Sequence, residues 1–246
     1  MTTVCVIIPC YNEAKRLPVD AFLTYQQTHP DVAFCFVNDG SSDQTANVLT
    51  RLQAQNPAQT DVLNLARNVG KAGAVRAGML HSVARNCTYF GYFDADLATP
   101  LAAIDDLQRV LDSHPDTVFV MGSRIKHLGV RIERAAFRHY VGRIIATVIS
   151  FILRLPVYDT QCGAKLLRRD VVTAVFGQPF ISPWLFDVEV LARLIGHFGR
   201  PDLRGKLREE PLQEWIEQAD SRISPTYIFR MWIELYRIHR TYRHVR

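Results

Sequence analysis

The sequence predicts an α/β fold in which helices flank a mostly parallel β-sheet. Runs rich in β-forming residues recur along the first half of the chain, and stretches of helical character separate them. The runs lie at residues 4–9, 33–38, 62–65, 89–93 and 118–122. The chain has 246 residues, of which 48% are hydrophobic, so it can also bury a full core against such a sheet.

Local signals place helices between these strands. The expected helices lie at about 41–55, 70–85 and 100–113. Ser41 or Ser42 is the expected cap of the first helix, after an Asp-Gly turn. Thr99-Pro100 is expected to open the third, because proline is favoured in the first helical turn.

Cysteine usage and the lengths of the apolar runs exclude several classes of protein. The five cysteines are scattered without a C-x-x-C pair, so neither a disulfide framework nor a zinc site is expected, and a reducing cytosol fits. No basic region precedes the apolar run that ends at Pro9, so a signal peptide is not expected. The longest apolar run, 144–153, is about half of a membrane-spanning helix, and no transmembrane segment is predicted.

Charge is divided unevenly along the chain, whose formal net charge is +5. Residues 1–120 hold 8 Lys+Arg and 12 Asp+Glu, whereas residues 121–246 hold 21 and 12. The first half is therefore acidic and the second strongly basic. This asymmetry favours an anionic partner for the second half, such as a phosphate or a membrane surface.

Polar residues follow each of the five predicted strands. In chain order these strand ends are Tyr11-Asn12-Glu13, Asn38-Asp39-Gly40, residues 67–71, Asp94-Ala95-Asp96 and Ser123-Arg124. Ligands of open parallel sheets bind beyond the carboxyl ends of the strands. One such turn is ordinary loop chemistry, but five on one predicted edge favour a binding site.

The residue types at this edge suit a nucleoside diphosphate. Asp94 and Asp96 stand two positions apart after a strand, so their carboxylates can converge on one hard divalent cation. Lys71 and Arg124 can neutralise the remaining phosphate charge. Neither a G-x-G-x-x-G motif after the first strand nor a P-loop motif occurs, which disfavours dinucleotide dehydrogenases and P-loop NTPases.

The motifs at these positions resemble those of inverting glycosyltransferases of family two, which have the Rossmann-like GT-A fold. The matching segments are VIIPCYNEAKRLP, FVNDGSSDQT, NVGKAGAVRAGM, FDADLATP and GSR. Three further segments, YDTQCGAKLLRR, WLFDVEVLAR and EEPLQEW, resemble more narrowly the polyprenyl-phosphate branch, namely dolichyl-phosphate glucosyltransferases and related mannosyltransferases. The resemblance extends over residues 4–215.

This resemblance implies a role for each matching residue. By this resemblance, uridine or guanosine would be held by Pro9, Tyr11, Glu13 and Asp39. Asp94 and Asp96 would hold Mg2+ or Mn2+ with the diphosphate. Arg124 would face phosphate. Many relatives of the glucosyl type continue the acidic pair with Gly-Ala-Thr, and mannosyl types place Gln two residues after it. Here Leu97 and Ala98 follow, so no third side-chain metal ligand is supplied and the sugar is left open.

The acceptor decides which other groups the reaction needs. A lipid phosphate is already anionic near neutral pH and calls for cations, whereas a hydroxyl calls for a general base. The candidate cations are Arg131, Arg134, Arg138 and Arg143, which could share one side of a helix, and of these Arg134 and Arg138 are the catalytic candidates. A solvated helix face is the alternative interpretation of these arginines.

An acidic motif supplies the candidates for a general base. Asp187 and Glu189 resemble the acceptor-side acidic residues of the family. A structural role for one of them, as a helix cap or as a partner of Arg193, is equally expected. Asp187 is the catalytic candidate of the two.

The C-terminal segment predicts a basic amphipathic helix over residues 226–246. Such a helix can lie on an anionic bilayer with its aromatic side chains among the headgroups. Packing onto the catalytic domain or a second subunit is the alternative. The predicted organisation is a GT-A domain over 1–215, with a nucleotide-sugar half (1–124) and an acceptor half (125–215), followed by a helical extension over 216–246.

The resulting hypothesis is a metal-dependent inverting hexosyltransferase that uses a nucleotide sugar, with UDP-glucose favoured, and a polyprenyl-phosphate acceptor. It would work at the cytoplasmic face of a membrane as a peripheral protein. A homo-oligomer is compatible with the sequence, and nucleic acid is not an expected partner. The alternatives are a family-two enzyme with a hydroxyl acceptor and a nucleotide-sugar-binding protein without turnover.

Overall fold

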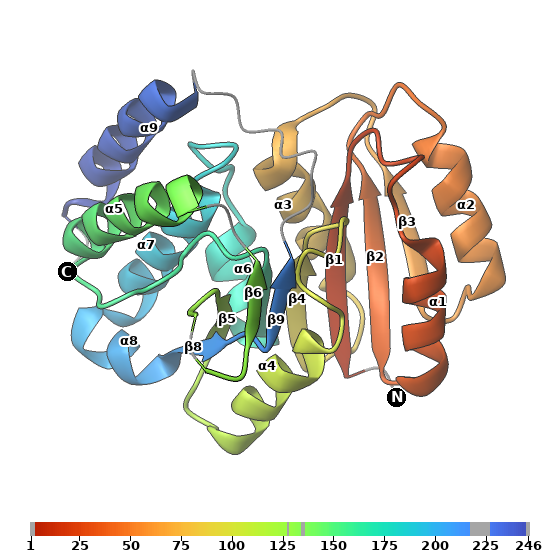
Figure 1. Cartoon of the computed structure of the whole chain (residues 1–246), viewed down its shortest axis with the longest axis horizontal. Helices are drawn as coiled ribbons and strands as arrows, with labels where there is room; N and C mark the ends of the chain where they lie inside the picture. The colour runs from red at the N-terminus through yellow and green to blue at the C-terminus, as the bar shows by residue number, and fades with distance from the viewer. Residues whose placement is uncertain (1–2, 127, 134–135, 217–226, 245–246) are drawn as a thin grey trace.

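A seven-stranded sheet forms the centre of the molecule, in the order β3-β2-β1-β4-β7-β5-β8 (Figure 1). The computed structural model describes residues 3–126, 128–133, 136–216 and 227–244, without the side chains of 136–141 and 227–229. The strands are β1 (Val4–Cys10), β2 (Val32–Asn38), β3 (Thr60–Asn64), β4 (Tyr89–Phe93), β5 (Phe119–Ser123), β7 (Ala164–Arg168) and β8 (Leu207–Pro211). Two short strands, β6 (Arg131–Glu133) and β9 (Glu214–Ile216), pair in parallel as a separate small sheet.

The main sheet is mostly parallel, as the sequence predicts. The strand β7 is antiparallel to both of its neighbours, β4 and β5, and the other six strands run in one direction. All five predicted strands are present, with ends within two residues of the expected positions. The antiparallel strand at 164–168 is a feature that the sequence reasoning did not anticipate.

Helices cover both faces of this sheet (Figure 1). They are α1 (Val19–Thr28), α2 (Thr45–Gln55), α3 (Gly70–Ser82), α4 (Ala103–Ser113), α5 (Ala136–Leu153), α6 (Arg169–Phe176), α7 (Phe186–Phe198), α8 (Arg200–Lys206) and α9 (Tyr227–Tyr242). Alternate residues of β1 point to opposite faces, so Cys5 and Ile7 join one core cluster and Val6 and Ile8 the other. Strands covered on both faces are apolar throughout, which explains their continuous hydrophobic runs.

Two expected helix caps are wrong. The helix α2 begins at Thr45 rather than directly after Ser41 or Ser42, because Ser41 Oγ instead accepts a hydrogen bond from Asn12 N. The helix α4 begins at Ala103, three residues after Pro100, without a side-chain cap at its first turn. In both places the polar residues belong to the loops at the carboxyl edge of the sheet.

The C-terminal segment contains the expected helix, α9, which packs against α7 and α5. Its side chains Met231, Leu235 and Ile238 are buried in the core cluster that they share with α7. Trp232 and Tyr236 are 42% and 62% exposed, so the same helix also has an aromatic outer face. Among the described residues, no helix combines the length and apolar character that crossing a bilayer requires.

Candidate active site

The acidic pair lies at the carboxyl end of β4, in the middle of the sheet. Asp94 N donates a hydrogen bond of 3.1 Å to Gly163 O, in the loop that leads into β7. Asp96 Oδ1 accepts from Ala98 N at 3.0 Å, and this tight turn puts Leu97 in the left-handed region at φ 51°. A non-glycine residue pays about 1–2 kcal/mol for that conformation. A glycine at this position would adopt it without strain.

Lys71 lies against this pair. It is in the first turn of α3, and its ammonium group forms an ion pair with Asp94 Oδ1. Burial lowers the pKa of Lys71, but Asp94 and Asp187 outweigh burial and raise it above its usual value. Lys71 therefore carries a positive charge beside the acidic pair, as the strand-end pattern predicts.

The pair has the properties of a site for a hard divalent cation. Burial and the neighbouring charge of Asp94 raise the pKa of Asp96, although its hydrogen bond from Ala98 N acts in the opposite direction. A carboxylate whose charged form is disfavoured in this way gains from a cation beside it. Oxygen ligands of this kind suit Mg2+ and Mn2+. The donor set therefore fits the metal that the resemblance implies.

The loops after β1 and β2 are joined by hydrogen bonds and form one wall of the site. Ser42 N donates to Asn12 Oδ1 at 2.9 Å, and Glu13 N donates to Thr45 Oγ1 at 2.8 Å. The Glu13 carboxylate pairs with Arg16 at 2.8 Å and is buried. Pro9 is one residue before the end of β1, and Tyr11, which is 37% exposed, directly follows that strand.

Asp39 holds the loop that leads into α3. Its two carboxylate oxygens accept from Val69 N at 2.7 Å and Gly70 N at 3.0 Å. Burial raises the pKa of Asp39 above its usual value, although these two hydrogen bonds oppose the shift. The next residue, Gly40, has φ 60°, and a Cβ there would stand 2.4 Å from the backbone of Arg67. This close approach explains the Asp-Gly sequence.

Arg124 is fixed by a residue that the sequence reasoning did not single out. Its Nε and Nη2 donate to the two carboxylate oxygens of Asp159 at 2.6 and 2.8 Å, and its guanidinium lies over Trp215. Burial raises the pKa of Asp159, but Arg124 outweighs it and holds that pKa at about 2. The arginine expected to face phosphate is thus anchored at the end of β5.

Asp187 is held by two buried donors. Tyr92 Oη donates to Asp187 Oδ1 at 2.6 Å, and Lys165 Nζ pairs with the same oxygen at 2.8 Å. The Lys165 side chain is 1% exposed and the Asp187 side chain 6%. Asp187 is in the first turn of α7, while Lys165 comes from β7. A buried cation from a strand that the sequence did not predict therefore anchors the predicted acidic residue.

Glu189 has the structural role that the sequence left open for one of the two acidic residues. Its side chain is fully buried and pairs with Arg193 at 2.8 Å. It also accepts from Ile181 N and from Tyr242 Oη, both at 2.8 Å. Glu189 thus joins α7, the preceding loop and the C-terminal helix.

The prediction that four arginines share one side of a helix is wrong. Arg131 lies in strand β6, where its side chain pairs with Glu133 at 2.7 Å. Arg143 is in α5, but it donates to Tyr158 O at 2.8 Å and stacks on that ring. Arg134 lies outside the described residues, and so does the side chain of Arg138, whose backbone is in α5.

Comparisons with known proteins show which family the sequence resembles. The model of the family described as glycosyl transferase family 2 matches residues 5–176. The dolichyl-phosphate beta-glucosyltransferase of Homo sapiens is 31% identical over 245 residues, covering 94% of this chain and 71% of the human one. The mouse protein of the same name is 37% identical over 202 residues, covering 76% of this chain and 61% of the Mus musculus one.

Solved structures share the fold at low sequence identity. Mannosyl-3-phosphoglycerate synthase from Rubrobacter xylanophilus superposes with a TM-score of 0.70 at 15% identity, over 96% of this chain and 72% of its own. Glucosyl-3-phosphoglycerate synthase from Mycobacterium tuberculosis, in complex with uridine diphosphate, superposes with a TM-score of 0.66 at 14% identity. The match covers 97% of this chain and 80% of the synthase.

Proposed function

The chain belongs to glycosyl transferase family 2, and from this premise we propose that it transfers glucose from UDP-glucose to dolichyl phosphate or a related polyprenyl phosphate. The relatives above carry the name of that activity. The observation that carries the proposal is the acidic pair Asp94 and Asp96 beside the cation Lys71, at the edge of the sheet where ligands of parallel α/β folds bind.

In the proposed reaction the donor lies along the carboxyl edge from β2 to β4. Pro9, Tyr11, Glu13 and Asp39 form the part that receives uridine, on the wall joined by the β1 and β2 loops. Asp94 and Asp96 would hold a divalent cation, either Mg2+ or Mn2+, which would supply Lewis-acid stabilisation of the departing diphosphate. Lys71 and Arg124 supply further positive charge at the phosphates.

The acceptor phosphate attacks the anomeric carbon from the face opposite the diphosphate, which inverts its configuration. Because a phosphate monoester has a second pKa of about 6, it is already an anionic nucleophile near neutral pH. Cations that position it are then needed, and we assign Arg134 and Arg138 to this role. Asp187, fixed by Tyr92 and Lys165, would orient a substrate hydroxyl.

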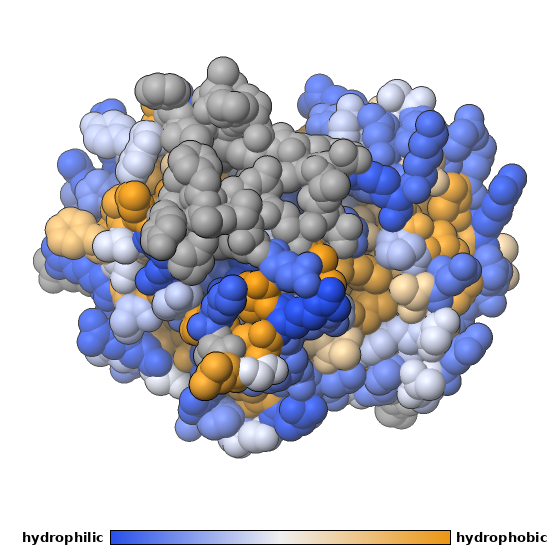
Figure 2. Space-filling view, viewed as in Figure 1, coloured by the Kyte–Doolittle hydropathy of each residue, from blue (hydrophilic) through white to orange (hydrophobic). Residues whose placement is uncertain are grey.

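A lipid acceptor places the enzyme at a membrane surface, and exposed side chains of α5 and α9 suit that position. Phe151 is 84% exposed and Ile144 60%, while Tyr236 of α9 is 62% exposed. Arg143 and Arg154 border a groove of about 620 Å³ that also contains Phe151. Figure 2 shows apolar side chains beside strongly hydrophilic ones on the side where α5 and α9 lie. We therefore propose peripheral contact with an anionic bilayer.

The direct test is transfer of radiolabelled glucose by the full chain. UDP-glucose, dolichyl phosphate and Mn2+ or Mg2+ should give an organic-extractable glucosyl lipid, and chelation by EDTA should stop its formation. GDP-mannose in place of UDP-glucose should give much less product. Donor hydrolysis without any lipid product, under conditions in which the protein is folded, would contradict the proposal.

Two variants distinguish a phosphate acceptor from a hydroxyl acceptor. If phosphate is the nucleophile, Arg138→Ala should raise the acceptor KM and lower kcat/KM by about tenfold or more, as expected from a lost charge-assisted hydrogen bond. Asp187→Asn should keep more activity than Arg138→Ala, because nothing is deprotonated at the moment of attack. Arg51→Ala, at an exposed position of α2, is the matched control. An inactive but folded Asp187→Asn with a near-normal Arg138→Ala would indicate a hydroxyl acceptor.

Gly163→Ala should disable the site without removing any functional group. A Cβ at residue 163 would stand 2.0 Å from Asp94 Oδ2 and 2.5 Å from Asp94 Cγ, so the carboxylate must move. A displacement of about 1 Å in a catalytic group can cost about 100-fold in rate, and we expect a loss of that size in kcat/KM. Gly205→Ala is the control, since a Cβ there has no neighbour within 4 Å. Equal activity of the two variants would show that Asp94 need not hold its position.

A further inference from the structure

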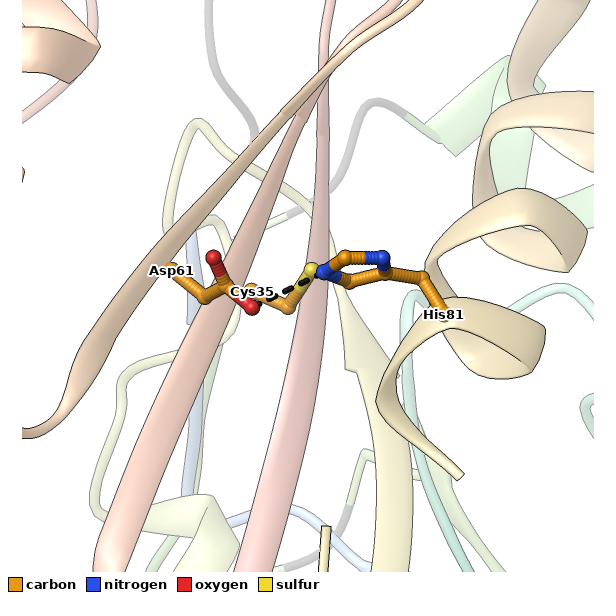
Figure 3. Close-up of side chains that lie close together, drawn as sticks. All are labelled: Cys35, Asp61 and His81. Atoms are coloured by element: carbon orange, nitrogen blue, oxygen red, sulfur yellow. Dashed lines mark hydrogen bonds and ion pairs between the residues drawn. The ribbon is translucent and has the colours of Figure 1, made fainter. Parts of the chain in front are cut away.

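Three metal-binding side chains meet away from the acidic pair, on the α3 face of the sheet. They are Cys35 of β2, Asp61 of β3 and His81 in the last turn of α3. One ligand atom from each lies within 4.8 Å of the other two. Figure 3 shows the three side chains pointing toward one another, with His81 Nε2 at 2.9 Å from Asp61 Oδ2.

This cluster is separate from the nucleotide edge. His81 is ten residues beyond Lys71 on the same helix, and ten residues of α-helix span about 15 Å. Asp61 is near the beginning of β3, at the end of that strand opposite to the carboxyl edge. A cation held by these side chains would therefore not touch the sugar or its diphosphate.

The ligand types differ from those of the acidic pair. A thiolate, an imidazole and a carboxylate together favour Zn2+, whereas the oxygen ligands of Asp94 and Asp96 favour Mg2+ or Mn2+. Three protein ligands with a fourth position open to water form a common zinc arrangement. The side chain of His81 is 42% exposed, so the cluster can be reached from solvent.

The charges around the cluster suit exchange of one cation for another. Arg85 Nη2 lies 3.1 Å from Asp61 Oδ2, and its side chain is 31% exposed. Arg85 can turn into solvent when a metal ion takes its place.

We propose that Cys35, Asp61 and His81 form a binding site for a zinc ion, distinct from the divalent-metal site at Asp94 and Asp96. In the metal-free protein Arg85 forms an ion pair with the Asp61 carboxylate, which the zinc ion would bind. The sequence reasoning missed this site because its ligands come one each from three separate elements, without the close spacing that marks zinc motifs.

Cobalt is a suitable probe, because a thiolate bound to Co2+ gives a near-ultraviolet charge-transfer band that oxygen ligands do not give. Titration of the metal-free full chain with Co2+ should produce this band and reach saturation at one equivalent. Zn2+ should abolish the band, because it would replace Co2+, whereas Mg2+ in large excess should leave the band unchanged. The acidic pair contains no sulfur, so its occupancy does not contribute to this signal.

Variants test the assignment residue by residue. Cys35→Ser should remove the band, and His81→Ala should weaken Co2+ binding by at least about tenfold, since even outer-shell partners are worth that much. Arg85→Ala should tighten binding, because it removes the competing cation; an ion-pair cluster without a metal function predicts no such gain. Cys162→Ala and His114→Ala are the matched controls and should bind as the parent protein does.

Two results would overturn the proposal. The first is absence of the charge-transfer band in the folded parent protein at every Co2+ concentration. The second is a band that persists unchanged in Asp61→Asn and His81→Ala, both of which alter partly exposed side chains and should fold. Neither result bears on glucosyl transfer, so this proposal and the proposed function can fail independently.

Discussion

Asp96→Asn is expected to lower kcat/KM for metal-dependent glucosyl transfer by about 100-fold or more. The variant removes one of two carboxylates that would hold the cation, and Lewis-acid stabilisation of a leaving group contributes several kcal/mol to such reactions. The amide oxygen can still accept the hydrogen bond from Ala98 N, so the turn should survive. Initial rates across a range of Mn2+ concentrations, together with a thermal melt, measure both effects.

The control for this variant is Asp20→Asn, which alters an exposed carboxylate in the first turn of α1. It should have the parent rate and the parent dependence on Mn2+. If Asp96→Asn also turns over at the parent rate, the acidic pair does not hold the catalytic metal. A variant that melts well below the parent protein would show that Asp96 is needed for the fold instead.

Lys165→Met is expected to reduce the free energy of unfolding by about 3–5 kcal/mol. The methionine has a similar length, but it leaves the Asp187 carboxylate buried with only Tyr92 of these two donors. Removing one member of a buried ion pair costs this much because the other charge stays in a poorly solvated place. Chemical denaturation at neutral pH measures the change.

Two further variants make this result specific. Lys15→Met, at an exposed position, should change the free energy of unfolding by no more than about 0.5 kcal/mol. The double variant Lys165→Met with Asp187→Asn should be more stable than Lys165→Met alone, because no unpaired charge then remains. If the double variant is no better, the loss comes from packing around residue 165 and not from the charge of Asp187.

The sequence predicted the parts of the fold that local pattern encodes. The strands β1, β2 and β4 are continuous apolar runs, since helices cover both their faces, and the polar residues that follow them meet at one edge. The strand β7 is apolar apart from Lys165 and Arg168, but no local signal shows that it runs antiparallel between β4 and β5. That placement is a property of the tertiary fold.

The parts of the candidate site that could be predicted are those in which the residue type and its position after a strand indicate the chemistry. Asp94, Asp96 and Lys71 are charged groups at strand ends, and the structure brings them together. Asp159 and Lys165 were missed because their partners, Arg124 and Asp187, are more than 20 residues away. The need for glycine at residue 163 was missed for the same reason, because the group it must avoid is the carboxylate of Asp94, far away in the sequence.

The position of β7 has a consequence for the order in which the protein can assemble during synthesis. In the finished sheet β4 and β5 do not pair with each other, because β7 lies between them. About 40 residues separate the end of β5 from the beginning of β7. At translation rates of about 5–20 residues per second, this corresponds to roughly 2–8 s. During this interval the nascent chain has one edge of β4 unpaired and lacks the partner that joins β5 to the sheet. Exposed edges of this kind are the surfaces through which chains associate wrongly, so the ribosome-bound intermediate, more than the finished enzyme, is the state in which chaperones would protect this protein.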